Sequence, residues 1–423
     1  MIDESLTLNI LAHPLKETQR ATYVSDRFPA TREGSGKTVI LLSGHWLESP
    51  RRAGFHWLAE SLWQQGWTVI FMTTGVSLLS QIKQHPSRIA MLKEIPHNQL
   101  IWHRERLASF LWYTPWHPVK FRSALLDHGF SLLFAQYGNL SLYGMKQQFQ
   151  VADLVIFEST SGLLLFDRIR RLNPRAKLVY RVSDDLRHLA TPPCVLRQER
   201  RIAPQFDLIS LPSELLRAIF PSLDTVHFQP HGIPLDRFSQ SHPNPYPDNG
   251  QVHAVSVGTM FFDLAALEYA SRIYPDVSFH IIGAIDPDLE RENVHFYGEL
   301  DFEQMIPYIQ WADLGLALYH CDQGEAKYLG QSSNKLIQYS YCQLPIVAPT
   351  FACWGRDHAF GYDSADLETL DSAIQKALRY DRSQISISNI PSWHQLASSI
   401  VQSVSDAPRF SKASMPASYS RDC

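Results

Sequence analysis

Short apolar runs alternate with helical stretches twice along the chain, and this repeated alternation restricts the fold more than any other feature. The first array begins with "TVILLSGH" (38–45), a β-branched run that suits a strand buried on both faces. The helical pattern "RRAGFHWLAESLWQQG" (51–66) follows it and stops at a glycine. A second array of the same kind starts at Val252. Two successive β-α-β arrays predict an α/β chain with two doubly wound, mainly parallel sheets.

The predicted strands are short, apolar and rich in β-branched residues. In the first array they are "TVILLSGH" (38–45), "WTVIFMTT" (67–74), "LVIFEST" (154–160), "KLVYRVSD" (177–184), "DLISLPS" (207–213) and "VHFQPHGI" (226–233). In the second array they are "HAVSVGTM" (253–260), "VSFHIIGA" (277–284), "VHFYGEL" (294–300), "LGLALYH" (314–320) and "LPIVAPT" (344–350).

The segment "SQSHPNPYPDNGQ" is dense in Pro, Asn, Asp and Gly, which predicts a linker between two domains. Ligands of such sheets bind beyond the carboxyl ends of the strands, and here we expect them in a central cleft between the domains. The expected organisation is a polar N-terminal extension (1–36), a first Rossmann-like domain (37–238), the linker (239–251), a second Rossmann-like domain (252–385), a helix crossing back to the first domain (386–405) and a disordered tail (406–423).

Composition narrows the function classes. With 423 residues, 45% of them hydrophobic and 19% charged, the chain can form two substantial cores. A net charge of −4 gives no general reason to expect nucleic-acid binding. The five cysteines are scattered and form no C-x-x-C pair, so we expect free thiols in a reducing compartment.

Membrane contact, if there is any, is expected to be peripheral. The N-terminal residues include two early acids and no sustained apolar core, so they do not resemble a secretory signal. No apolar run reaches the ~20 residues that span a bilayer. The least charged run, 128–145, contains Gln136, Asn139 and three glycines, and it predicts a buried helix.

Glycine patterns argue against a dinucleotide-dependent enzyme. Such an enzyme needs G-x-G-x-x-G at a first strand–helix turn, and neither "LLSGHWLESP" (41–50) nor "SVGTMFFD" (256–263) provides it. Two Rossmann-like domains facing each other are also the plan of the GT-B glycosyltransferases. A sugar nucleotide then needs a metal or protein donors for its leaving diphosphate. The D-x-D at Asp286 and Asp288 is interpreted as a solvated proline turn, so we expect no metal.

The stretch "QSSNKLIQ" offers protein donors instead. Ser332 and Ser333 are predicted to open a helix, while Lys335 and Gln338 lie three positions apart and share a face. Free amides at a helix start together with a cation suit a diphosphate. The alternative is an ordinary N-cap followed by a surface lysine. The position of this stretch, at the helix after the fourth strand of the second array, favours the diphosphate site.

A pair of acids follows the predicted strand "KLVY". Asp184 and Asp185 stand at its carboxyl end, where a carboxylate is well placed to take a proton from an acceptor hydroxyl. The alternative is that one of them caps the next helix. We expect one to cap and one to act, with Asp184 as the base and Asp185 on the acceptor side.

Several motifs spread over both domains together resemble one family, the inverting glucuronosyltransferases of xanthan gum biosynthesis. The resemblance runs from about Thr38 to Ala377 and rests on "SPRRAGFH", "VIFEST", "NPRAKLVYRVSD", "HAVSVGTMFFD", "SFHIIG", "YGEL", "YLGQSSNKLIQY" and "FGYDSAD", in the family's order. It implies a GT-B fold and UDP-glucuronate as donor. It also implies a polyprenyl-diphosphate-linked, mannose-terminated oligosaccharide as acceptor, at the cytoplasmic face of the bacterial inner membrane.

The resemblance also implies roles for single residues. The family's catalytic aspartate corresponds to Asp184, and its donor-binding residues correspond to Met260, Glu299, Tyr319, Lys335 and Gln338. Two positions depart from the family pattern: Asp185 replaces a glycine and Asn334 replaces a methionine. Retaining GT-B enzymes usually carry two glutamates eight positions apart in this region. Glu325 is present but Ser333 is its eighth neighbour, which favours inversion.

The segment 103–126 mixes basic residues with aromatic ones, a composition that suits the headgroup layer of an anionic membrane. The alternative is a helical hairpin whose aromatics belong to a core. The lipid-linked acceptor favours membrane contact, and the predicted contact residues are Arg106, Trp112, Trp116, Lys120 and Arg122. Arg51 and Arg52, after the first strand, are predicted to lie on the acceptor side.

Two alternative functions remain open from the sequence. The first is the same fold using another UDP- or GDP-sugar. The second is a non-catalytic sugar-nucleotide-binding subunit of a polysaccharide assembly complex.

Overall fold

The computed structural model describes residues 36–78, 80, 92–93, 95–121, 123–285, 289–320 and 327–406. These residues divide into two compact units. The N-terminal unit comprises 36–239, 327–337 and 387–406, and the C-terminal unit comprises 240–320 and 338–386, each with the gaps just given.

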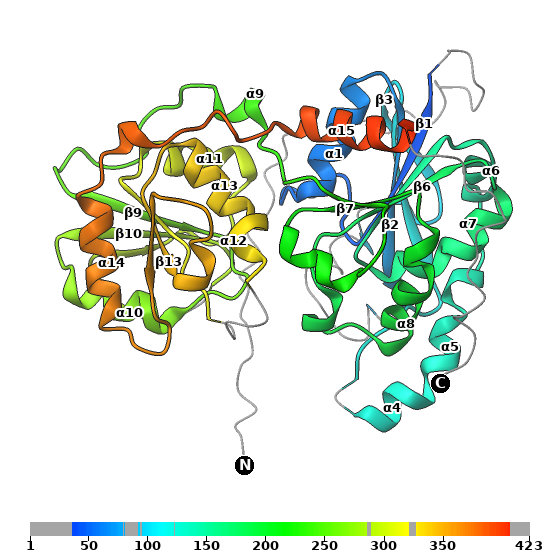
Figure 1. The fold of residues 1–423 in the computed structure, drawn as a ribbon, viewed down its shortest axis with the longest axis horizontal. Coiled ribbons are helices and arrows are strands. Elements are labelled where there is room, and N and C mark those ends of the chain that lie inside the picture. The colour runs from blue at the N-terminus through cyan, green and yellow to red at the C-terminus, as the bar shows by residue number, and fades with distance from the viewer. Residues whose placement is uncertain are drawn as a thin grey trace. The chain divides into compact units, whose positions relative to one another are not determined.

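The N-terminal unit is built on an eight-stranded sheet of order β3-β4-β2-β1-β5-β6-β7-β8 (Figure 1). Its strands are parallel except for β3, which pairs antiparallel with β4. The strands are β1 (Thr38–Ser43), β2 (Thr68–Ser77), β3 (Leu100–Arg104), β4 (Leu107–Thr114), β5 (Leu154–Glu158), β6 (Lys177–Arg181), β7 (Leu208–Leu211) and β8 (Val226–Phe228). The α-helices are α1 (Gly54–Gln64), α4 (Ala124–Gly129), α5 (Ser131–Ala135), α6 (Met145–Val151), α7 (Phe166–Leu172), α8 (Pro193–Ile202), α9 (Leu235–Phe238), α12 (Leu329–Ser332) and α15 (Trp393–Asp406). The 3-10 turns are η1 (Tyr137–Asn139), η2 (Ser161–Leu165), η3 (Leu186–His188), η4 (Ala203–Gln205) and η5 (Glu214–Ile219).

The C-terminal unit has a six-stranded, all-parallel sheet of order β11-β10-β9-β12-β13-β14. Its elements are β9 (Val252–Val257), α10 (Leu264–Ile273), β10 (Val277–Ile282), β11 (Val294–Phe296), α11 (Phe302–Trp311), β12 (Leu314–Leu316), β13 (Ile346–Pro349), η6 (Thr350–Ala352), β14 (Ala359–Tyr362), α14 (Thr369–Leu378) and η7 (Arg382–Gln384). Helix α13 (Asn334–Tyr341) begins in the N-terminal unit and ends in the C-terminal one.

The return of the chain to the N-terminal unit is fixed by α15, which lies beside α1 (Figure 1). The Trp393 ring packs so closely on Gly54 that a Cβ there would lie 2.8 Å from it. Gln65 at the end of α1 donates to the His394 carbonyl at 2.9 Å. A segment from the end of the sequence therefore completes a fold that begins near residue 38.

Helix α13 is held against the C-terminal sheet by its tyrosine. The Tyr339 hydroxyl accepts from the Val257 amide at 3.0 Å and donates to the Val255 carbonyl at 3.2 Å. A Cβ on Gly315 of β12 would lie 2.5 Å from the Tyr339 ring, so only glycine allows this approach.

Three strands were not predicted from the sequence: β3, β4 and β14. Strand β4 takes up residues 107–114 of the segment 103–126, so the alternative of a helical hairpin is wrong for this part. The predicted buried helix over 128–145 is also wrong, because this run forms α5 and η1 and exposes several large apolar side chains. The linker carries one buried anchor: Tyr246 stacks on His253 at 4.3 Å between ring centroids.

Candidate active site

Asp184 and Asp185 lie just past the carboxyl end of β6, an inner strand of the N-terminal sheet. Because β5 and β6 are parallel and adjacent, their carboxyl ends meet at one edge. The residues after both strands therefore share this edge, as expected for ligand sites of doubly wound sheets.

Asp185 stabilises the turn that follows it in the chain. Its carboxylate caps η3 by accepting from the Arg187 amide at 3.0 Å, and it also pairs with the Arg187 guanidinium at 2.5 Å. Burial alone raises the pKa of Asp185, but hydrogen bonds and positive charge from Arg187 and His188 outweigh burial and leave that pKa below its usual value. The expectation that one acid of the pair caps the next turn is confirmed for Asp185.

Asp184 has the opposite environment. Burial raises the pKa of Asp184, and the negative charge of Glu158 raises it further. The Tyr328 hydroxyl donates to Asp184 Oδ1 at 3.3 Å, which acts in the opposite direction and lowers the pKa in part. A carboxylate with a raised pKa and one weak hydrogen bond is better suited to accept a proton than its paired neighbour.

Glu158, at the end of β5, was missed in the sequence as a site residue. Its carboxylate accepts from the Ser43 hydroxyl at 2.5 Å, the Gly44 amide at 3.1 Å and the Ser183 hydroxyl at 3.2 Å. These donors come from the ends of β1 and β6, so Glu158 is fixed beside the loop that carries Asp184. The signal was available, since Glu158 follows the apolar core of the predicted strand 154–160 directly.

In the C-terminal unit, Met260, Tyr319 and Glu299 all follow strands at the carboxyl edge of the sheet. Met260 is exposed in the loop after β9, and Tyr319 is buried after β12. These two loops are joined, because the His320 amide donates to the Phe261 carbonyl at 2.7 Å. Glu299 is exposed after β11.

The loops after β9, β10 and β11 are also linked through glycines. The Gly258 amide donates to the Ile282 carbonyl, and the Gly283 amide to the Gly298 carbonyl, both at 2.8 Å. The structure thus brings three of the predicted donor-binding residues to one edge of one sheet.

The predicted helix start is partly confirmed. Ser333 precedes α13 in an extended conformation, and its carbonyl accepts from the Ile337 amide at 3.2 Å, as an N-cap does. Ser332 instead ends the separate helix α12, where its hydroxyl donates back to the Tyr328 carbonyl at 3.0 Å. The expectation that both serines open one helix is therefore wrong for Ser332, because a one-turn helix precedes the start of α13.

Lys335 and Gln338 lie on α13, as predicted. The Lys335 Nζ is shielded from solvent, and burial lowers the pKa of Lys335 to about 7. Gln338 is buried. A shielded lysine on the first turn of a helix differs from the solvated surface lysine that was the alternative interpretation.

The predicted membrane-contact residues differ in burial and do not all face solvent. Trp112 is 0% exposed inside β4, its indole donates to the Ser141 carbonyl at 2.7 Å, and the prediction that it contacts a membrane is wrong because it is a core residue. Trp116 is half-buried, and Lys120 forms an ion pair with Asp127 at 2.5 Å. Arg106 lies in the β3–β4 turn and donates to the Gly66 carbonyl at 3.0 Å.

Arg51 and Arg52 lie in the loop after β1, on the carboxyl side of that strand. The Arg52 guanidinium donates to the Leu47 carbonyl at 3.3 Å and lies 5.6 Å from the Trp57 ring.

Some predicted residues and segments lie outside the described part of the chain: Arg122, Glu325, Asp286, Asp288, most of the extension 1–36 and nearly all of the tail 406–423. Among the described residues no group of three His, Cys, Asp or Glu is arranged to hold a metal ion. No helix in the described part of the chain is long and apolar enough to cross a membrane.

Comparison with known proteins identifies the family. Residues 41–212 match the family described as glucuronosyltransferase GumK, N-terminal domain. The chain is 32% identical over 348 residues to a UDP-glucuronate:glycolipid 2-beta-glucuronosyltransferase of Xanthomonas campestris pv. campestris, covering 81% of this chain and 84% of that protein. The chain belongs to this glucuronosyltransferase family. It is therefore a glycosyltransferase, and the alternative of a non-catalytic subunit is disfavoured.

Solved structures agree on the fold. The N-terminal domain of Candida albicans trehalose-6-phosphate phosphatase superposes with a TM-score of 0.59 at 13% identity, covering 89% of this chain and 98% of that one. Trehalose 6-phosphate synthase of Burkholderia multivorans gives a TM-score of 0.56 at 10% identity, covering 88% and 98%. At such low identities these likenesses concern the fold alone, which is GT-B with two Rossmann-like α/β domains.

Proposed function

We propose that this glycosyltransferase moves glucuronate from UDP-glucuronate to a glycolipid, with inversion at the anomeric carbon. The observation that carries the catalytic part is the contrast between the two acids after β6. The Asp185 carboxylate caps η3 and forms an ion pair with Arg187, so it is already engaged. Asp184 is half-buried and its pKa is raised. The Xanthomonas relative, which acts on a glycolipid by its name, supports the choice of donor and acceptor.

In this mechanism Asp184 accepts the proton of the acceptor hydroxyl while the hydroxyl oxygen attacks the anomeric carbon. The bond from that carbon to the UDP oxygen breaks, and negative charge grows on the departing diphosphate. Lys335 and the positive end of the α13 dipole balance this charge. Met260, Glu299, Tyr319 and Gln338 hold the donor. We propose that the reaction needs no divalent metal, because the lysine and the helix start supply the positive charge.

On the acceptor side we propose a polyprenyl-diphosphate-linked oligosaccharide that ends in mannose. Arg51 and Arg52 are the candidates for its diphosphate, because they follow β1 on the same edge as Glu158 and Asp184. The protein would then act as a peripheral protein at the cytoplasmic face of the bacterial inner membrane.

The test replaces each of the two aspartates by asparagine, which has the same shape, and compares the effects on transfer. Asp184→Asn should lower transfer from UDP-glucuronate by about 10²–10⁴-fold, as loss of a general base does, and keep UDP binding. Asp185→Asn should have a much smaller effect on transfer. Transfer of radiolabelled sugar to a lipid extract, with UDP-glucose and UDP-N-acetylglucosamine as competing donors, measures both the base and the donor. Reversed effects of the two substitutions, or preference for another donor, would contradict the assignment.

A further inference from the structure

A chain of hydrogen bonds through the interior of the N-terminal unit ends at the loop that carries Asp184. The Ser183 amide donates to the Ser159 hydroxyl oxygen at 3.1 Å. The Ser159 and Tyr180 hydroxyl oxygens lie 3.1 Å apart, and the Tyr180 hydroxyl donates to Glu199 Oε1 at 2.5 Å. We call Ser159, Tyr180 and Glu199 the anchor chain, because they join the residue before Asp184 to a carboxylate on α8.

The number of protons fixes the direction of each bond in the anchor chain. A backbone N–H can only donate, so the Ser159 oxygen accepts from Ser183. The single hydroxyl proton of Tyr180 goes to Glu199, so Ser159 is the donor between the two hydroxyls. The last member must accept without donating, which an ionised carboxylate does. Glu199 therefore orients every donor of the chain towards α8.

Glu199 is 4% exposed, which is unusual for a carboxylate. Burial raises the pKa of Glu199, while the hydrogen bond from Tyr180 and the positive charge of Arg187 oppose this rise. A buried carboxylate costs free energy that an apolar side chain of similar size would not. Packing alone therefore does not account for Glu199, and its hydrogen bond to Tyr180 is the contact that does.

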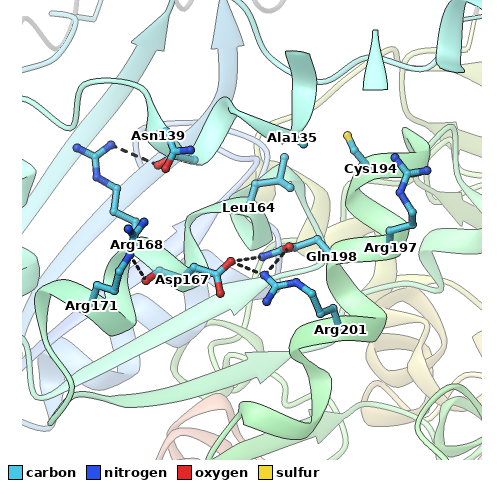
Figure 2. Close-up of a pocket in the computed structure, with 11 residues that line it drawn as sticks. Ala135, Asn139, Leu164, Asp167, Arg168, Arg171, Cys194, Arg197, Gln198 and Arg201 are labelled. Atoms are coloured by element: carbon cyan, nitrogen blue, oxygen red, sulfur yellow. Dashed lines mark hydrogen bonds and ion pairs between the residues drawn. The ribbon is translucent and has the colours of Figure 1, made fainter. Parts of the chain in front are cut away.

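The far end of the anchor chain lies on a helix that is held in place. Figure 2 shows the cavity of about 420 Å³ between α7 and α8, where two residues of α8 contact Asp167 of α7. Gln198 Nε2 donates to the Asp167 carboxylate at 3.2 Å, and Arg201 forms an ion pair with it (Figure 2). These contacts flank Glu199 on α8, so its carboxylate is a fixed end point for the chain.

The middle of the anchor chain is equally constrained. The Tyr180 ring is 0% exposed in β6 and stacks with the Phe206 ring at 5.4 Å between centroids. The Phe220 ring contacts it edge-on at 5.9 Å. Rings on two sides fix the ring plane, and the direction of the hydroxyl follows from it.

The main chain is fixed on both sides of Asp184. On one side, the Ser183 amide bonds to Ser159 and the Ser183 hydroxyl donates to Glu158 Oε1 at 3.2 Å. On the other side, Asp185 caps η3. The position of the Asp184 carboxylate is therefore set through the backbone of its neighbours.

We propose that Ser159, Tyr180 and Glu199 are positioning residues for transfer, which hold Asp184 where it can take the proton of the acceptor hydroxyl. A general base must lie within hydrogen-bond reach of that proton, and a misplacement of about 1 Å can cost about 10²-fold in rate. The three residues act through the main chain of Ser183 and need no contact with a substrate. This proposal rests on the proposed role of Asp184 as the base.

Steady-state kinetics of Tyr180→Phe tests the anchor chain, because this substitution removes one hydroxyl and keeps the ring. The variant should lower kcat by about 10- to 100-fold, as a displaced base does. Its KM for UDP-glucuronate should stay within about twofold of wild type, because the proposed donor-binding residues lie on α13 and in the C-terminal unit.

The matched control is Tyr246→Phe. It removes another buried tyrosine hydroxyl that donates at 2.5 Å, in this case to the Tyr308 carbonyl. Tyr246 stacks on His253 near the start of β9, at the amino end of the C-terminal sheet. This variant should keep the wild-type kcat and KM.

Two further variants grade the effect. Ser159→Ala, a smaller change, removes the acceptor of the Ser183 amide and should lower kcat to a similar extent. Glu199→Gln keeps an oxygen that can accept from Tyr180, but the bond is no longer charge-assisted, so kcat should fall less than in Tyr180→Phe. Thermal unfolding of each variant shows whether it is folded.

A double-mutant cycle separates positioning from a general loss of structure. If the chain acts through Asp184, its loss should matter little once the carboxylate is gone. Asp184→Asn/Tyr180→Phe should then transfer sugar within about threefold of Asp184→Asn alone. A purely structural defect would lower the residual transfer of Asp184→Asn by the same factor as it lowers wild-type transfer.

Three results would overturn the proposal: a kcat of folded Tyr180→Phe or Ser159→Ala close to that of wild type, an equal loss in the Tyr246→Phe control, or additive losses in the cycle. Failure of the proposed function has a different signature, since Asp184→Asn alone would then leave transfer intact. A large loss in Asp184→Asn with no loss in the anchor-chain variants would keep the base and reject its positioning by the chain.

Discussion

Two adjacent aspartates with the same intrinsic chemistry are given different properties by their neighbours. Arg187 holds the carboxylate of Asp185 in its charged form, while burial and Glu158 disfavour the charged form of Asp184. Such divergence of neighbouring carboxyl groups is a general way in which folds assign acid and base roles. At the residue scale, Glu158 and Tyr328 are therefore expected to tune the base without touching the substrate.

The pH dependence of kcat/KM tests this tuning. Asp184 must be ionised to accept a proton, so the acidic limb of the profile follows its pKa in the free enzyme. Glu158→Gln removes a negative charge, which lowers that pKa and moves the limb to lower pH. Tyr328→Phe removes a hydrogen bond to the carboxylate, which raises the pKa and moves the limb to higher pH. Glu214→Gln, at an exposed carboxylate of the same unit, is the control. If the acidic limb moved in the same direction in Glu158→Gln and in Tyr328→Phe, Asp184 would be excluded as the titrating base.

The sequence identified candidate site residues where they directly follow a predicted strand, because the carboxyl end of a parallel strand is where ligands bind. Asp184 was identified in this way, and Glu158 satisfied the same rule without being selected. Trp112 was misassigned because the same mixture of aromatic and basic residues occurs in a membrane interface and in an inner strand with charged flanks. Its burial depends on the pairing of β4 with β2 and β3, which local composition does not encode.

At the scale of elements, most parallel strands were predictable, but the edge strands β3 and β14 and the inner strand β4 were not. The strands flanked by glycine or turn residues matched the predicted runs, since their apolar cores are continuous. Strand β3 carries Trp102, His103 and Arg104 and lies at the sheet edge, where one side faces solvent, and it has no such run. Helix α13 was predicted, but the break at Ser333 was not, because two helices in succession resemble one in their hydrophobic spacing.

The start of α13 should couple donor binding to protonation. Burial lowers the pKa of Lys335 to about 7 in the free protein. A bound diphosphate favours the charged lysine and raises that pKa, so UDP binding should take up protons, and affinity should fall as pH rises above about 7. Calorimetry at about pH 8 in buffers of different ionisation enthalpy measures this uptake, because the phosphates of UDP are then already ionised. Lys335→Met should abolish the uptake and weaken UDP binding.

The matched control for this experiment is Lys376→Gln, at an exposed lysine near the end of α14. It should bind UDP with wild-type proton uptake. Uptake that persists in Lys335→Met would assign the titration to another group and leave Lys335 without a role at the diphosphate.

At the scale of the whole molecule, the chain leaves the N-terminal unit at residue 239, contributes residues 327–337 to it on the way through the C-terminal unit, and returns to it at residue 387. The returning segment is hydrogen-bonded to the residues that precede the departure of the chain from the N-terminal unit. The Ile233 amide donates to the Pro391 carbonyl at 2.9 Å. Helix α15 then buries an apolar stripe in the N-terminal unit: Trp393, Leu396, Ala397, Ile400 and Val404. The N-terminal unit is thus incomplete until α15 is made.

Truncation tests this dependence. A chain that ends at Ser386 loses the five buried side chains of α15, roughly 5–10 kcal/mol of burial, which approaches the whole stability of a typical domain. Its N-terminal unit should unfold at a much lower temperature or fail to fold, while the C-terminal unit should keep its own transition. A chain that ends at Asp406 retains α15 and should match the full protein. Calorimetry and hydrogen exchange, resolved by unit, measure both. Unchanged protection of α1 and β1 in the shorter chain would contradict the prediction, because α1 would then be stable without the helix that covers it.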